Sequence, residues 1–332
     1  MGTPDFSVPA LNNLCKEHEV VAVVTQPDKR KGRGKAMAFS PVKEAAIAHG
    51  IPVLQPQKVR EEGFVEELRS FNPDVIVVVA FGQILPESIL TLPRYGCINI
   101  HASLLPKYRG AAPIQWAVIN GEKESGVTTM FMEKGLDTGD MIDKVVVPLE
   151  PKETGESLHD KLSAAGGELI LKTLADLAGG SLVRTPQDDH QSSYAGMLKK
   201  DMGEIDWTRS ACEIERLIRG LNSWPSAYTH VSGKTLKLWD ADVVTGLPGK
   251  TGSLMNGQMD GRKVENDSLD RKEGSREDPA CGTVIMVTKD HFYVQTGKDI
   301  LKVNEVQLQG KKRMAVSSFL LGFPITEGLL FI

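Results

Sequence analysis

The chain is organised around residues 97–113, which read CINIHASLLPKYRGAAP. The pattern predicts a short buried strand that runs into a turn and the start of a helix. Because alternate side chains of a strand share a face, Asn99 and His101 should point the same way, about 6.5 to 7 Å apart along the strand. Ile98 and Ile100 should take the other face. A polar pair at the end of an apolar strand is costly to bury unless it is hydrogen-bonded or used, so we consider it first.

An Asn-x-His pair does not by itself define a catalytic site. His101 could be an ordinary buried histidine with a hydrogen-bond partner, and Asn99 could be a turn residue. Taken alone, the pair is better explained in that way. The surrounding sequence therefore decides between the two readings.

Strand and helix patterns alternate before and after this stretch. Strands are expected at residues 20–25, 51–54 and 75–80, and helices at residues 8–17, 41–49 and 61–70. The continuously apolar run at residues 75–80 is typical of a parallel strand covered on both faces. We expect an α/β domain over residues 1–183 with a doubly wound, mostly parallel sheet of Rossmann-like type. Ligands of such sheets bind at the carboxyl ends of the strands, where Asn99 and His101 would lie.

The sequence changes character after Gly180. Residues 184–204 are polar and irregular and predict a linker. Residues 205–332 then contain one helix and several short strands with tight turns, which favour a small OB-like β-barrel. Residues 248–279 are rich in Gly, Ser and charges of both signs, so we expect a disordered insertion there.

Composition narrows the class of protein. The 332 residues carry a formal net charge of -4, so no global basicity indicates nucleic acid, and any RNA contact must come from local clusters. The four cysteines form no C-x-x-C pair, which suggests neither a disulfide framework nor a zinc site and suits a reducing cytoplasm. No apolar run approaches the ~20 residues that span a membrane, and no signal peptide is recognisable. A phosphate-cradling loop or dinucleotide fingerprint is also missing, which argues against a dehydrogenase.

Three short runs follow the polar pair: 103–106 (SLLP), 108–110 (YRG) and 111–113 (AAP). Together with Asn99 and His101 they resemble the folate-binding signature of formyltransferases that use 10-formyltetrahydrofolate. Residues 135–140, GLDTGD, resemble the second signature loop of that family. The resemblance places Asp137 beside the histidine and implies formyl transfer from the N10 nitrogen of the folate to an amine, without a metal.

Formyl transfer makes definite demands: the oxyanion formed by amine attack must be stabilised, the amine must lose a proton and N10 must gain one. The Asn99 amide and the His101 imidazole could supply N–H donors to that oxyanion. Asp137 could take the amine's proton, directly or through a water. Taken alone, Asp137 would be a loop carboxylate that accepts backbone N–H groups. Its match to the signature assigns it, with Asn99 and His101, a catalytic role.

The slot for the pterin ring is expected on residues 103–106 and on residues 81–86, which follow the buried strand. The co-substrate residues assigned on this basis are Phe81, Gly82, Ile84, Leu85, Ser103, Leu104, Leu105 and Pro106. Without the resemblance, the apolar members of this set would simply be core. Arg109 could meet a folate carboxylate or a phosphate, or could be an ordinary surface arginine.

The acceptor is indicated by two other regions. Residues 29–35, KRKGRGK, form a basic, glycine-rich loop that could follow a phosphate backbone. The loop resembles the one with which tRNA-formylating members of the family contact the acceptor stem, with Arg33 at the matching arginine. Residues 205–207, 219–225 and 310–314 resemble the carboxyl-terminal barrel of those members. Contacts to tRNA are assigned to Lys29, Lys31, Arg33, Lys35, Lys311, Lys312 and Arg313, although a solvated turn explains the last three nearly as well.

The resemblance implies a cytoplasmic, monomeric enzyme of translation initiation that formylates the amino group of initiator methionyl-tRNA. Two alternatives remain. The acceptor could be a small amine, which the basic loop and the barrel argue against. The chain could also bind tRNA without catalysis, which the presence of Asn99, His101 and Asp137 argues against.

Family members carry an apolar strand immediately before the stretch that corresponds to Gly2-Thr3-Pro4-Asp5, whereas Met1 stands here where that strand ends. The first strand of the sheet is therefore expected to be missing. Without it, backbone groups of neighbouring strands would lack partners and part of a helix layer would be uncovered. We expect the chain as written to be less stable than one extended by such a strand.

Overall fold

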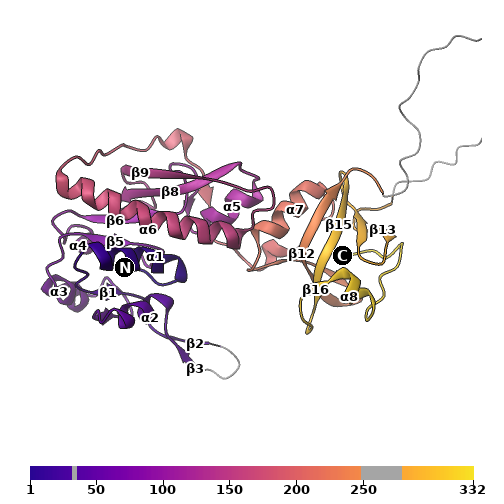
Figure 1. Ribbon diagram of the computed structural model, residues 1–332, viewed down its shortest axis with the longest axis horizontal. Helices are drawn as coiled ribbons and strands as arrows, with labels where there is room; N and C mark the ends of the chain where they lie inside the picture. Colours follow the sequence, from indigo (N-terminus) through magenta and orange to yellow (C-terminus); the bar gives the residue numbers. More distant parts are fainter. Residues whose placement is uncertain (32–35, 248–278) are drawn as a thin grey trace, which may run out of the picture. The chain divides into compact units, whose positions relative to one another are not determined.

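Figure 1 shows a computed structural model of the chain, which describes residues 1–31, 36–247 and 279–332. The described residues form two compact units, Met1–Lys199 and Lys200–Ile332. The predicted disordered insertion falls almost entirely on residues 248–278, which lie outside the described ranges. No helix within those ranges is long and apolar enough to cross a membrane.

The first unit is an α/β structure, as predicted. Its strands are β1 (Val23–Val24), β4 (Val53–Leu54), β5 (Ile76–Val78), β6 (Cys97–His101), β8 (Glu124–Phe131) and β9 (Met141–Pro148). The pairs β1–β4 and β5–β6 are parallel, whereas β6–β8 and β8–β9 are antiparallel. The sheet is therefore mixed, because the chain returns from β8 to β9 through a short loop instead of a helical crossover.

Helices cover this unit: α1 (Val8–Glu17), α2 (Pro41–Ala48), α3 (Glu62–Ser70), α4 (Glu87–Leu90), α5 (Pro113–Ile119) and α6 (Gly155–Gly179), with a 3₁₀ turn at Asp5–Ser7. The long helix α6 begins at a capping box of Thr154 and Ser157 and ends at Gly180, whose φ is +70°. Leu158, Leu162 and Ile170 on α6 share one apolar core with residues of β6 and β8. Figure 1 shows α6 running alongside these strands.

That core fixes the orientation of β6. Ile98 and Ile100 are buried in the cluster that contains the α6 leucines, and Gly166 lets α6 approach closely, since a Cβ there would lie 2.8 Å from Ile100. Because alternate residues of a strand point to opposite faces, Asn99 and His101 point away from α6. The helix thus decides which side of the sheet carries the polar pair.

Met1 and Gly2 lie between β1 and β5 and connect the two pairs of strands. The Gly2 N–H donates to the Val24 carbonyl at 3.0 Å, and the Val79 N–H donates to the Met1 carbonyl at 2.9 Å. The Met1 amino group donates to the Val77 carbonyl at 2.6 Å. Burial lowers the pKa of this amino group from 8.0 to about 6.

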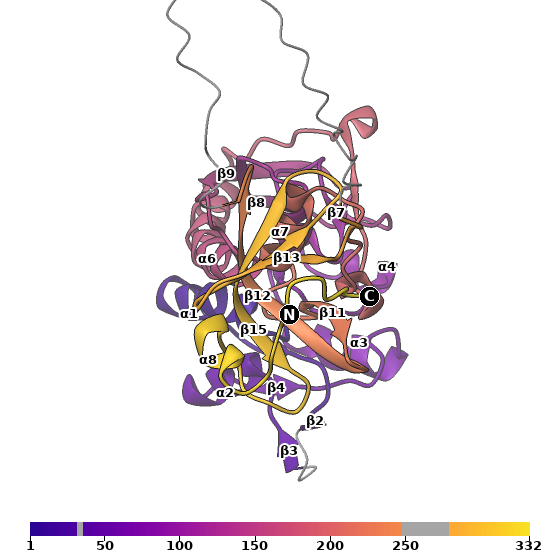
Figure 2. The same ribbon diagram turned by 90° about the vertical axis from the view of Figure 1, so that its right-hand side faces the viewer.

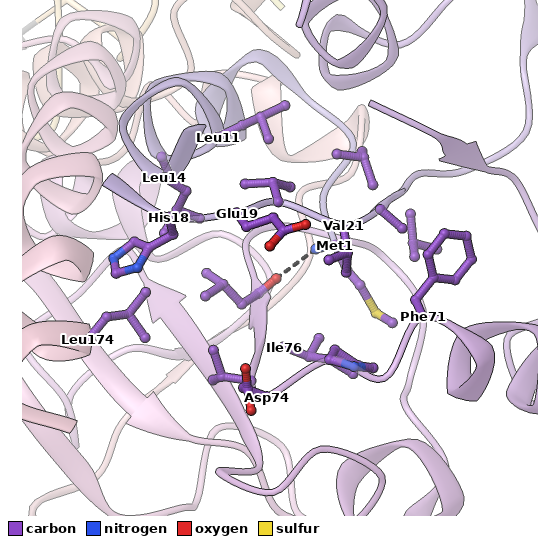
Figure 3. A pocket seen from close by; sticks show the side chains of 18 of the residues that line it. Met1, Leu11, Leu14, His18, Glu19, Val21, Phe71, Asp74, Ile76 and Leu174 are labelled. Atoms are coloured by element: carbon purple, nitrogen blue, oxygen red, sulfur yellow. Dashed lines mark hydrogen bonds between the residues drawn. The ribbon is translucent and has the colours of Figure 1, made fainter. Parts of the chain in front are cut away.

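Beside these two residues lies a cavity of about 530 Å³. Figure 3 shows side chains of its lining, which include Leu11, Val21, Phe71, Ile76 and Leu174. The cavity runs along residues 20–24 of one strand segment and residues 75–77 of the other. It therefore has the position that a further strand between β1 and β5 would occupy.

The second unit is built on an antiparallel sheet with the order β11-β12-β15-β14-β13, with β16 paired to β15. The bounds are β11 (Ala227–Val231), β12 (Lys234–Val244), β13 (Val284–Val287), β14 (Phe292–Gln295), β15 (Ile300–Leu308) and β16 (Met314–Ala315), and the helices are α7 (Ala211–Gly220) and α8 (Val316–Leu320) (Figure 2). Phe331 hydrogen-bonds to Gly282 beside β13, and Ile332 hydrogen-bonds to His230 of β11. The carboxyl-terminal residues thus link the two edges of the sheet and close it.

The remaining short elements are the hairpin of β2 (Lys29–Lys31) and β3 (Ala36–Ala38), the parallel pair of β7 (Arg109–Gly110) and β10 (Tyr194–Ala195), and 3₁₀ turns at Asp189–Gln191 and Asp201–Gly203. The pair of β7 and β10 includes two residues of the predicted linker, Tyr194 and Ala195. Residues 185–195 of that linker are bonded to the first unit through β10 and through a bridge between Met141 and Thr185.

Candidate active site

The carboxyl end of β6 carries the polar pair in two different environments. Asn99 is half-buried between Val78 of β5 and Met130 of β8. Within the described part of the chain its side-chain amide has no hydrogen-bond partner, so the amide can bind a ligand. His101 is almost completely buried, with 6% of its side chain exposed.

Both ring nitrogens of His101 face protein groups. Nε2 lies 2.9 Å from the Tyr108 carbonyl oxygen. Because a carbonyl only accepts hydrogen bonds, Nε2 must carry a hydrogen. Nδ1 lies 3.7 Å from a carboxylate oxygen, Oδ2 of Asp137. The ring is therefore held at Nε2, and Nδ1 faces the Asp137 carboxylate.

Asp137 lies in the loop between β8 and β9. Its Oδ2 accepts a hydrogen bond from the Gly110 N–H at 2.8 Å, and 15% of its side chain is exposed. Its φ of +52° lies in the left-handed region, which side chains with a Cβ adopt at a cost on the order of 1 kcal/mol or more. The fold thus brings Asp137 against His101 and holds it in a conformation that the local sequence disfavours.

The turn at residues 103–106 is fixed to β8 and β9. Thr128 Oγ1 donates to the Ser103 carbonyl at 2.7 Å and accepts from the Leu105 N–H at 3.2 Å. Lys144 Nζ donates to the Leu105 carbonyl at 2.6 Å, and burial lowers the pKa of Lys144. The Leu105 side chain packs on Met130 and Met141, whereas Leu104 and Pro106 are half-buried. The side chains of Ser103 and Leu105 therefore face the protein interior.

The segment at residues 81–86 is divided in the same way. Phe81 and Leu85 are buried in a core cluster with Ile76 and Val78, while Gly82 is exposed and Ile84 is 88% exposed. Of the residues assigned to the co-substrate in this segment, only Gly82 and Ile84 are open to a ligand in this conformation. The apolar residues of this segment are therefore divided between the core, at Phe81 and Leu85, and the surface, at Ile84.

This segment also adjoins the base of the basic loop. Gln26 Nε2 donates to the carbonyls of Phe81 and Gly82 at 3.1 and 3.2 Å, and Gln26 Oε1 accepts from Lys29 Nζ at 3.0 Å. Lys29 is thus placed next to the expected co-substrate segment. Lys31 is in β2, and Arg33 and Lys35 lie outside the described residues.

Arg109 is held by two side chains of the segment that follows α6. Its Nε donates to Gln187 Oε1 at 3.0 Å, and its Nη2 lies 2.8 Å from Asp189 Oδ1. Only 12% of the Arg109 side chain is exposed. No local pattern marks these partners, because about 80 residues separate them from Arg109 along the chain.

In the second unit, the three basic residues that follow β15 differ in whether they have an interaction partner. Lys311 and Lys312 are exposed. Arg313 pairs with Glu305, and its guanidinium lies 4.7 Å from the ring centre of Trp239. Two of the three predicted tRNA contacts are therefore free to meet a phosphate, and the third is partly neutralised.

Amide, imidazole and carboxylate groups at the end of a strand are the groups that an acyl-transfer site requires. The profile of the formyl transferase family matches residues 1–174, and that of the formyl transferase carboxyl-terminal domain matches residues 197–324. The chain belongs to the formyl transferase family.

Its relatives define the branch of the family. The chain is 54% identical over 332 residues to a methionyl-tRNA formyltransferase from Agathobacter rectalis, with 100% of this chain and 98% of that protein covered. It is 53% identical over 331 residues to a methionyl-tRNA formyltransferase from Lachnospira eligens, with 99% and 98% covered.

A solved structure of a sugar N-formyltransferase, WlaRD, covers 94% of this chain and 97% of its own, with a TM-score of 0.62 at 18% identity. The N-formyltransferase from Helicobacter canadensis covers 91% and 97%, with a TM-score of 0.60 at 17% identity. At such identities the likeness concerns the fold, and it confirms the predicted fold class.

Proposed function

We propose that the chain transfers the formyl group of 10-formyltetrahydrofolate to the amino group of initiator methionyl-tRNA, giving formylmethionyl-tRNA for translation initiation in the cytoplasm. The observation that carries this function is the 54% identity to a methionyl-tRNA formyltransferase over the whole chain. The match spans the whole chain, so it extends over both signature stretches and both units. The site at the end of β6 supplies the groups that the reaction needs.

In the proposed reaction the free Asn99 amide donates a hydrogen bond to the formyl oxygen as negative charge develops on it. His101, whose Nδ1 lies 3.7 Å from the Asp137 carboxylate, is proposed as a second N–H donor to that oxygen. The amine attacks the formyl carbon, and its proton passes to Asp137 directly or through a water. The bond from the formyl carbon to N10 then breaks as N10 takes up a proton, so the proton lost by the amine is balanced.

The folate is proposed to lie against the exposed part of the 81–86 segment and the backbone of residues 103–106. Gly82 and Ile84 offer an open backbone and an exposed apolar side chain. The buried members of the predicted set, Phe81, Leu85, Ser103 and Leu105, would support this surface from behind. Apolar contact with a few polar backbone groups is the usual composition of such a site.

The tRNA is proposed to follow the basic loop in the first unit and the exposed lysines in the second. Lys29 stands beside the expected folate segment, and Arg33 belongs to the same loop by sequence. Lys311 and Lys312 are exposed and could each neutralise a phosphate.

The function is tested by offering labelled 10-formyltetrahydrofolate with three acceptors: initiator methionyl-tRNA, a ribonucleotide amine and an amino sugar nucleotide. We expect transfer to methionyl-tRNA alone. Arg33→Ala should raise KM for tRNA about tenfold without changing KM for the folate, since one charged contact is worth roughly 1.5 kcal/mol or more. Arg60→Ala, at an exposed arginine outside the loop, is the matched control. Equal transfer to a small amine would contradict the proposed acceptor.

A further inference from the structure

Gln187 lies in the segment that follows α6 and precedes β10, and it is bonded to both parts of the candidate site. Its Nε2 donates to the Asp137 carbonyl and to the Gly139 carbonyl, each at 2.8 Å. Its Oε1 accepts from Arg109 Nε at 3.0 Å. One half-buried carboxamide thus joins the loop that carries Asp137 to the strand β7.

The loop needs such support because its local geometry is constrained. Asp137 has a φ of +52°, in the left-handed region that disfavours a side chain with a Cβ. Gly139 lies so close to Phe131 that a Cβ would stand 1.9 Å from the Phe131 carbonyl oxygen. The two hydrogen bonds from Gln187 bind the backbone on either side of Thr138, so they fix the turn in which Asp137 sits.

The other end of Gln187 is fixed as well. Arg109 orients the carboxamide through Nε, and Asp189 holds the Arg109 guanidinium at 2.8 Å. The next residue after Arg109 is Gly110, whose N–H donates to Asp137 Oδ2. The Asp137 backbone is therefore linked to Arg109 of β7 through Gln187. The Asp137 carboxylate is linked directly to the next residue of β7, Gly110.

We propose that Gln187 is a positioning residue that holds the Asp137 carboxylate against His101 for formyl transfer. The inference rests on the function proposed above for that site. A glutamine suits the position because it offers two donors to the two carbonyls and one acceptor to Arg109. Glutamate has the same shape but no donor when ionised, so its oxygen would face two carbonyl oxygens.

The test compares Gln187→Glu with Gln191→Glu, a matched change in the same segment. The Gln191 side chain donates to Asp188 on the surface, and among the described residues no hydrogen bond joins it to the Asp137 loop. We expect Gln187→Glu to lower kcat about 10- to 100-fold, as displaced catalytic groups do, while KM for both substrates changes less than about threefold. Gln191→Glu should keep kcat within about twofold of wild type.

A double-mutant cycle with Asp137→Asn separates positioning from a general structural effect. If Gln187 acts through Asp137, Gln187→Glu should lower kcat little further once Asp137 has lost its charge. The inference would be overturned if the kcat losses of the two single variants multiplied in the double variant, or if Gln187→Glu left kcat unchanged. The proposed site would still stand in either case, provided that Asp137→Asn alone has a low kcat. A wild-type kcat for Asp137→Asn would overturn both. Gln187→Met, which keeps the length without the hydrogen bonds, replaces Gln187→Glu in the cycle if the carboxylate prevents folding.

Discussion

Two regions beside β5 differ in what lines them. The cavity between β1 and β5 measures about 530 Å³ and is lined largely by apolar side chains such as Val21, Ile76 and Leu174. The region at the end of β6 instead brings His101, Asp137 and Asn99 together with backbone groups from several segments. None of these three residues lines the cavity. We therefore propose the chemistry at the converging polar groups and not at the cavity, although the cavity is a well-formed hollow.

The largest difference in kcat between a substitution at the end of β6 and one in the cavity lining is expected for Asn99→Ala. Loss of one oxyanion donor should lower kcat by about 10²- to 10³-fold, or about 2.7 to 4 kcal/mol of transition-state energy. Val21→Ala, in the cavity lining, should lower Tm but leave kcat unchanged. Steady-state formyl transfer and thermal melting of both variants provide the check. An Asn99→Ala enzyme with wild-type kcat would place the oxyanion elsewhere.

The buried Met1 amino group predicts a pH dependence of stability for a protein that begins with a free Met1. Its pKa falls from 8.0 to about 6 on folding because burial disfavours the charged form. Between these values the unfolded chain binds more protons, so stability is greatest above pH 8 and is lost as pH falls through 6. The loss amounts to roughly 2 to 3 kcal/mol at 1.36 kcal/mol per unit of pKa.

Urea unfolding at pH 5.5, 7 and 8.5 measures this dependence, with an amino-terminally acetylated chain as control. The acetylated chain has no amine to titrate, so the difference between the two curves isolates Met1. Parallel curves over the whole range would show that the amino group is not buried.

Filling the cavity should stabilise the fold without affecting the site. An extension of about five β-branched residues before Met1 could pair with both β1 and β5, and each buried apolar side chain contributes about 1.5 to 3 kcal/mol before the entropy of ordering is subtracted. We expect Tm to rise by at least about 4 °C. A Gly-Ser extension of equal length should give no rise. Equal melting temperatures for all three chains would refute the prediction.

The smallest effect is expected in the second unit. Replacing Lys311 and Lys312 with Ala should raise KM for tRNA about three- to tenfold and reduce its dependence on salt, since exposed lysines contribute mainly through phosphate charge. Lys289→Ala is the control, because its side chain is 91% exposed in the same unit. KM measured at two salt concentrations tests this, and an unchanged salt slope would remove these lysines from the tRNA surface.

Local signals predicted much of the fold. The bounds of α1 were predicted as observed at Val8–Glu17, and the capping box of Thr154 and Ser157 at the start of α6 is a signal of the same local kind. The strand at residues 97–101 has its isoleucines in the core and its polar pair on the other face. Each of these follows from periodicity or from capping, which depend on residues a few positions apart.

Contacts between residues far apart along the chain could not be predicted from the sequence. Gln187 and Asp189 meet Arg109 across about 80 positions, and nothing in their own neighbourhood marks them. The same holds for the sheet, whose antiparallel β8 and β9 look like any apolar strands in sequence. Apolar residues at 81–86 could not be divided into buried Phe81 and exposed Ile84 without the fold.

Whether the end of β6 carries the reaction is tested most directly by transfer of labelled formyl from 10-formyltetrahydrofolate to initiator methionyl-tRNA by wild type and His101→Ala in parallel. We expect wild type to be active and His101→Ala to retain about 1% of its rate or less, with tRNA binding preserved. A His101→Ala enzyme as active as wild type would contradict the assignment of the site.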